Sequence, residues 1–108
     1  MRSCTPTEAH RMFDEFFTAF QAAGRAVIRG SDLEAFNAAA SAAEATAKLP
    51  PSAATCLDLE RYLGLMFSLF FDAPLFWAKP LHQRQSVVDA IEATGVALAS
   101  AADSRRRH

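Results

Sequence analysis

The chain contains little glycine and proline, with four and five residues among 108, and it has two cysteines. Alanine is abundant, and this balance favours helix and disfavours disorder. The spacing of Cys4 and Cys56 matches no zinc or redox motif, so we expect two reduced thiols. The segment between Gly24 and Gly30 has no following lysine–serine or lysine–threonine pair. The sequence therefore contains no glycine-rich phosphate-binding loop.

Long hydrophobic runs are also missing. Residues 1–11 are polar and contain no apolar core of a signal peptide. The best candidate for a membrane span, residues 62–81, is interrupted by two charged residues and two prolines. These are Asp72, Pro74, Lys79 and Pro80. From both absences we predict a cytoplasmic protein without a membrane span.

Positive charge is scarce outside the C-terminal end. The formal net charge is −1, and Arg105, Arg106 and Arg107 supply three of the eleven basic residues. Residues 1–104 carry eight basic and twelve acidic side chains, and such an acidic body argues against a broad nucleic-acid surface. We interpret residues 105–108 as a polar basic tail that is solvated and complements the negative end of the last helix.

A first helix is predicted from a capping box that begins at Thr5 and has Pro6 at the first helical position. Apolar residues then recur in steps of three and four, which is one face of an amphipathic helix. They are Ala9, Phe13, Phe16, Phe20, Ala23 and Val27, with Met12, Phe17 and Ile28 widening the stripe. Gly30 occupies the position where a left-handed residue ends a helix.

A second helix is predicted from a second capping box, residues 31–34, to about Lys48. Its apolar stripe is Leu33, Phe36, Ala40, Ala43 and Ala47, which is thin because alanine buries little area. Pro50 and Pro51 end this helix. The short junction with the first helix predicts a tight helical hairpin.

A third helix is predicted to begin between Ser52 and Asp58 and to end near Phe71, with a single turn following at residues 75–78. A fourth begins near Pro80 or Leu81, and its stripe is Val88, Ile91, Gly95, Leu98 and Ala102. The sequence therefore predicts an all-α fold, an antiparallel bundle of about four helices with short connections. Residues 1–104 are predicted to form a single domain.

Candidates for chemistry are weak. His10 and Asp14 lie four residues apart on one helix face, but a metal site needs further ligands from another element. Cys56 lies in an apolar neighbourhood that raises a thiol pKa and makes it inert. We predict no catalytic, metal-binding or cofactor-binding residue, and we predict that the protein is not an enzyme.

The aromatic residues are concentrated in two windows, residues 13–20 and 62–77, which hold ten of the eleven. From residue 63 to residue 71 only Gly64 and Ser68 are not large and apolar, which is more than one bundle helix needs. We therefore predict a partner-binding surface on the third helix and the following turn. Its residues are Tyr62, Met66, Phe70, Phe71, Leu75, Phe76 and Trp77, with Arg25 and Arg29 as anchors for an acidic partner.

The sequence thus predicts a small interaction protein: an adaptor, inhibitor or regulatory subunit that forms a homodimer. Two alternatives stay open. Phenylalanine-lined bundle interiors can hold a hydrophobic small molecule or lipid. The arginine tail, residues 105–107, would serve a regulator that acts on nucleic acid. The alanine- and arginine-rich composition is typical of a bacterial coding bias.

Overall fold

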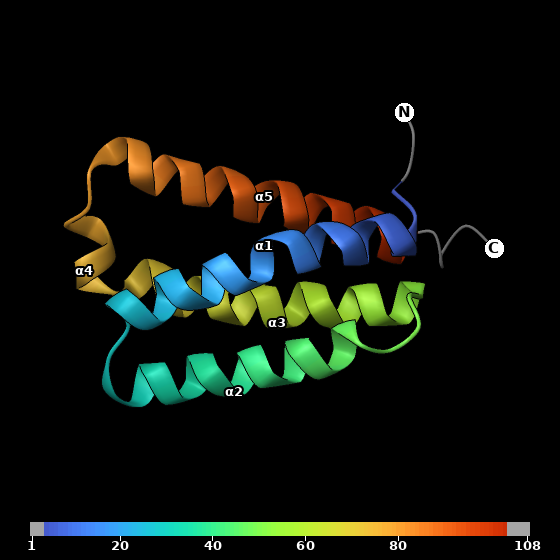
Figure 1. Ribbon diagram of the computed structural model, residues 1–108, viewed down its shortest axis with the longest axis horizontal. Helices are drawn as coiled ribbons and strands as arrows, with labels where there is room; N and C mark the ends of the chain where they lie inside the picture. Colours follow the sequence, from blue (N-terminus) through green and yellow to red (C-terminus); the bar gives the residue numbers. More distant parts are fainter. Residues whose placement is uncertain (1–3, 104–108) are drawn as a thin grey trace.

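The computed structural model describes residues 4–103, which form five α-helices and no strand (Figure 1). The helices are α1 (Pro6–Val27), α2 (Gly30–Ala47), α3 (Ala53–Asp72), α4 (Pro74–Trp77) and α5 (Leu81–Asp103). The all-helical prediction is confirmed. The predicted single turn after the third helix is α4. The predicted basic tail, residues 105–108, lies outside the described residues.

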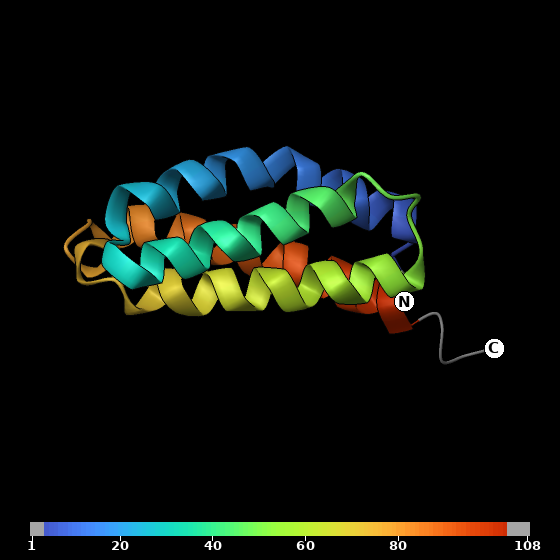
Figure 2. The ribbon, with the colours of Figure 1, turned by 90° about the horizontal axis from the view of Figure 1, so that it is seen from below.

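Consecutive long helices run in opposite directions, and α4 lies at one end of the molecule, between α3 and α5 (Figure 1). α3 packs mainly against α2 and α5, with a smaller contact to α1, and in Figure 2 it runs along the edge of the bundle opposite α1. α5 packs on α3 and α1, but residues 81–90 contain no fully buried side chain. The buried residues of α5 begin only at Ile91, near the middle of the helix, which leaves its first ten residues loosely covered. These buried residues are Ile91, Thr94, Ala97, Leu98 and Ala101.

The start of α1 follows the predicted capping box. Glu8 donates its backbone N–H to the Thr5 hydroxyl at 3.2 Å, and Thr5 donates its own to the Glu8 carboxylate at 3.4 Å.

The buried face of α1 differs from the predicted stripe at several positions. His10 and Gly24 are buried, whereas Ala23 is only partly buried. Phe17 is buried and Phe16 is only half-buried. A window of three-and-four steps fits both residues, and the packing of α1 against its neighbours selects Phe17.

The junction between α1 and α2 departs from the prediction. α1 ends at Val27, and Gly30 adopts the expected left-handed backbone (φ 65°) but begins α2. The predicted second capping box is therefore wrong: Arg29 is the N-cap of α2 and makes no side-chain cap bond. Asp32 lies inside the first turn, where its charge still complements the positive helix end.

α3 begins with a cap that the sequence did not single out. Ser52 accepts a hydrogen bond from the backbone of Thr55 at 3.0 Å, and the Thr55 hydroxyl accepts one from the backbone of Ser52 at 2.9 Å. This reciprocal pair is a capping box with threonine in place of the usual glutamate or glutamine. At its other end α3 runs to Asp72, and Ala73 takes an extended backbone before Pro74.

The core is joined by aromatic rings from four helices. Phe20 of α1 meets Phe36 of α2 edge-to-face at 5.8 Å between ring centres, and Phe70 of α3 at 5.4 Å. Phe70 in turn contacts Phe76 of α4 at 4.5 Å. Edge-to-face pairs contribute beyond their buried area, so this chain of rings fixes the end of the molecule at α4.

Candidate interaction surface

Three of the predicted partner-binding residues are enclosed by the chain itself. Met66, Phe70 and Phe76 are buried core residues, so they are not exposed to a partner. The structure leaves less apolar surface of the third helix exposed than the sequence analysis predicts. The reason is that α4 folds back and places Phe76 against Phe70, while α2 and α5 cover two further sides of α3.

The other predicted aromatic residues lie nearer the surface. Tyr62 and Phe71 are half-buried, whereas Leu75 and Trp77 of α4 are 47% and 50% exposed. Trp77 is held in place, because its indole N–H donates to the Phe71 carbonyl at 2.6 Å. The Arg84 guanidinium lies 5.1 Å from the centre of the Trp77 ring, at cation–π distance.

Arg25 and Arg29 are exposed and engaged within their own helical hairpin. Arg25 donates from Nε to the Asn37 side-chain oxygen at 2.9 Å, which links α1 to α2. Arg29 donates to the carbonyl of Ile28 at 2.9 Å and to that of Arg25 at 3.2 Å. The two Arg29 bonds satisfy carbonyls at the end of α1. Both arginines therefore have a structural role in the hairpin.

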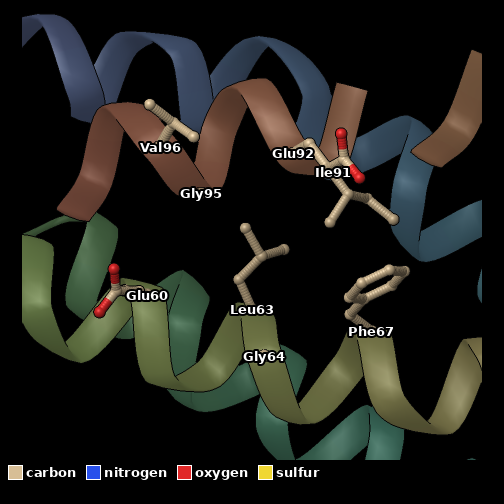
Figure 3. A pocket seen from close by; sticks show the side chains of 8 residues that line it. All are labelled: Glu60, Leu63, Gly64, Phe67, Ile91, Glu92, Gly95 and Val96. Atoms are coloured by element: carbon tan, nitrogen blue, oxygen red, sulfur yellow. The ribbon is translucent and has the colours of Figure 1, made fainter. Parts of the chain in front are cut away.

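A concave surface lies between α3 and α5, and we call it the α3–α5 groove (Figure 3). It has a volume of about 380 Å³. Its lining residues are Glu60, Leu63, Gly64, Phe67, Ile91, Glu92, Gly95 and Val96. Phe67 and Ile91 close one end, and Val96 stands at the other (Figure 3). Val96 is 69% exposed, and Leu65, which follows Gly64, is 57% exposed.

The two glycines of the groove are not explained by the fold. A Cβ atom added at Gly64 or Gly95 would meet no atom within 4 Å, and neither residue has a positive φ. Gly24 differs, because a Cβ there would overlap the buried ring of Phe36. Glycine in a helix interior costs about 1 kcal/mol relative to alanine. At Gly64 and Gly95 nothing among the described residues offsets that cost.

The groove carries negative charge at its walls. Glu60 belongs to α3 and Glu92 to α5, and their side chains stand toward opposite ends of the groove (Figure 3). Within residues 4–103, neither carboxylate has a hydrogen bond or an ion pair. None of the eight lining residues is a cation. The groove therefore combines an apolar floor with two uncompensated carboxylates.

The candidates for chemistry are separated by the structure. His10 is buried, and its Nε2 atom lies 2.8 Å from the Thr55 hydroxyl on α3, whereas Asp14 is exposed. Among the described residues, no group of three or more His, Cys, Asp or Glu side chains could hold a metal ion. His10 thus makes a core contact between α1 and α3.

Cys56 is fully buried at the start of α3, and Cys4 is partly buried. Burial raises the pKa of the Cys56 thiol to about 11, with a smaller contribution from Cys4. Burial also raises the pKa of Cys4. A thiol with a raised pKa is protonated at neutral pH and is a poor nucleophile.

No helix within residues 4–103 is both long and apolar enough to cross a membrane. Comparison of the chain with protein-family models, with curated proteins and with solved structures found no match. The α3–α5 groove was not predicted from the sequence, although Gly64 interrupts the apolar run of α3 and Gly95 lies in the predicted stripe of α5. Glycines at helix-interior positions are the signal that marks it.

Proposed function

We propose that this chain is an antiparallel bundle of four long helices that acts as a non-enzymatic protein–protein interaction module. Its docking surface is the α3–α5 groove, and the occupant is a helix of a partner protein. The observation that carries the proposal is the pair Gly64 and Gly95, which hollow the groove without serving the fold. Glycine permits another backbone to approach closely, which is a recurrent use of the residue.

Three further features support a helical occupant. Both walls of the groove are helices whose backbone groups are satisfied internally, so an added strand would find no partner edge. The floor is apolar, with Leu63, Phe67 and Ile91 beside the glycines. Val96 lines the groove beside Gly95 and stands exposed, where an apolar helix face would cover it.

Photocrosslinking in the native host tests this proposal. One variant of the chain carries a photoreactive amino acid at Val96. A control variant carries it at Ala45, which is exposed on α2 away from the groove. We expect a crosslinked partner, identified by mass spectrometry, at position 96 and not at position 45. A Cβ atom at Gly64 would meet no other part of the chain, so the variant Gly64→Leu places its side chain toward the groove and should abolish that crosslink.

The outcomes are distinct. A crosslink that survives Gly64→Leu, or the absence of any crosslink specific to position 96, contradicts docking in the groove. A product of twice the mass of the chain would instead identify a second copy as the occupant. Circular dichroism of Gly64→Leu checks that the helical fold is retained.

The carrier alternative has one observation in its favour. At about 380 Å³ the groove reaches the size of ligand pockets, roughly 300–1,000 Å³. The bundle interior predicted to hold such a ligand is instead filled by rings such as Phe13, Phe36 and Phe70. Native mass spectrometry of freshly purified protein separates the two functions, since a carrier would retain a small added mass that Gly64→Leu removes.

A further inference from the structure

Resting on the proposed function, we infer that the helix bound in the α3–α5 groove is basic. It carries an apolar stripe that faces Gly64 and Gly95, flanked by lysine or arginine residues that meet Glu60 and Glu92. The charge of the groove and the geometry of its walls support this inference.

The charged side chains that line the groove all have negative charge. Glu60 and Glu92 line it from opposite walls, and no lysine, arginine or histidine lines it. Among residues 4–103, neither carboxylate is paired. A helix laid along the floor would remove part of the water from both carboxylates. Removing water from a charge is costly unless the arriving surface supplies an opposite charge.

The positions of the carboxylates match a helix that lies along the groove. Glu60 stands on α3 toward the end marked by Val96, and Glu92 stands on α5 toward the end marked by Phe67 (Figure 3). One carboxylate therefore borders each side of the occupant, at different heights along it. A helix with an apolar stripe and basic residues on both flanks presents this arrangement.

A second copy of the chain fits the groove poorly. In a two-fold dimer the same patch packs on itself. Two grooves placed face to face would bring four carboxylates together without a cation from either lining. Like charges brought together raise the free energy of association, so the groove disfavours this homodimer. The same carboxylates repel the phosphates of a nucleic acid.

Two synthetic helical peptides test the inference with the full chain. Both carry the same stripe of leucine and alanine, and they differ by lysine or glutamate at the flanking positions. Each is labelled with fluorescein, and binding is followed by anisotropy at low and at high salt. We expect the lysine peptide to bind at least about tenfold more tightly than the glutamate peptide, a difference of about 1.4 kcal/mol. Its affinity should fall with added salt, because exposed charges are screened.

Charge-matched variants separate the groove from the net charge of the protein. The double variant Glu60→Gln/Glu92→Gln should weaken the lysine peptide by about tenfold or more, which is about 1.4 kcal/mol. The control Glu34→Gln/Glu44→Gln removes the same charge from exposed positions on α2 and should leave the affinity unchanged. Gly64→Leu should abolish binding of the lysine peptide.

The results distinguish this inference from the proposed function. If both peptides bind equally and Gly64→Leu blocks both, the groove docks helices but the basic partner is refuted. If the two double variants weaken the lysine peptide equally, binding follows net charge and the inference is also refuted. If neither peptide binds, the inference fails, while the crosslink at Val96 decides the function independently.

Discussion

The glycines within α1, α3 and α5 occupy helix interiors for different physical reasons. Gly24 lets the ring of Phe36 approach the backbone of α1, and that ring is fully buried and held edge-to-face by Phe20. Gly64 and Gly95 border open space in the α3–α5 groove. The first glycine therefore serves the fold, and the other two lower its stability without any contact among the described residues that needs them.

Alanine substitution distinguishes these roles. Gly24→Ala should destabilise the protein by about 1–3 kcal/mol, because an overpacked core must shift the Phe36 ring. Gly64→Ala and Gly95→Ala should each stabilise it by about 1 kcal/mol, through helix propensity alone. The measurement is the free energy of unfolding in urea, followed by circular dichroism at 222 nm. Destabilisation by Gly64→Ala would show that the fold needs this glycine, and the groove would lose its main support.

Helix ends show how far local chemistry determines an element. The capping box at Thr5 forms both of its hydrogen bonds, as predicted. Pro50 and Pro51 lie just beyond the end of α2. Residues 31–34 have the same type of pattern but form no capping box, because α2 begins two residues earlier than that box requires, at Gly30. A cap depends on which residue is the N-cap, and here the extended backbone of Ile28 and Arg29 decides that.

The capping residues of the two patterns, Thr5 and Ser31, should therefore contribute differently to the free energy of unfolding. Thr5→Ala removes a bond that the N-cap side chain accepts from the first turn of α1, and it should cost about 1 kcal/mol. Ser31→Ala removes no cap bond from α2, so it should change the free energy of unfolding by less than about 0.5 kcal/mol. Urea unfolding of both variants checks this. An equal loss for the two would mean that Ser31 caps α2 in solution.

At the scale of the whole molecule, apolar side chains are better enclosed than the sequence indicated. Phe70 and Phe76 lie in the core, and the exposed large apolar residues belong to different regions of the fold. They are Leu49 after α2, Leu65 on α3, Leu75 and Trp77 on α4, and Leu81 and Val96 on α5. The predicted homodimer stays a prediction, and the carboxylates of the groove weigh against forming it there.

We therefore expect any homodimer of the isolated protein to form outside the α3–α5 groove. Light scattering after gel filtration, at low salt and tens of micromolar protein, should give the same mass for the wild type and for Gly64→Leu. The variant Glu60→Gln/Glu92→Gln is measured beside the wild type, because it lacks the charge repulsion that disfavours pairing of two chains through the groove. A wild-type dimer that Gly64→Leu dissociates would overturn the argument against self-association.

The amino-acid sequence alone determined the helical class, the extent of α3 and α5 within a few residues, and the single turn at α4. These features depend on prolines, capping residues and apolar periodicity, all of which act within one or two helical turns. It did not reveal that Phe17 rather than Phe16 is buried, or that Met66 and Phe76 are enclosed. Those outcomes depend on which helix covers which face.

The α3–α5 groove depends on the tertiary structure and on no local sequence pattern. Gly64 and Gly95 are 31 positions apart in the sequence, and they face one space because α5 returns along α3. Glu60 and Glu92 line the same groove for the same reason. Packing between distant segments decides which residues share a surface, and no local pattern encodes it.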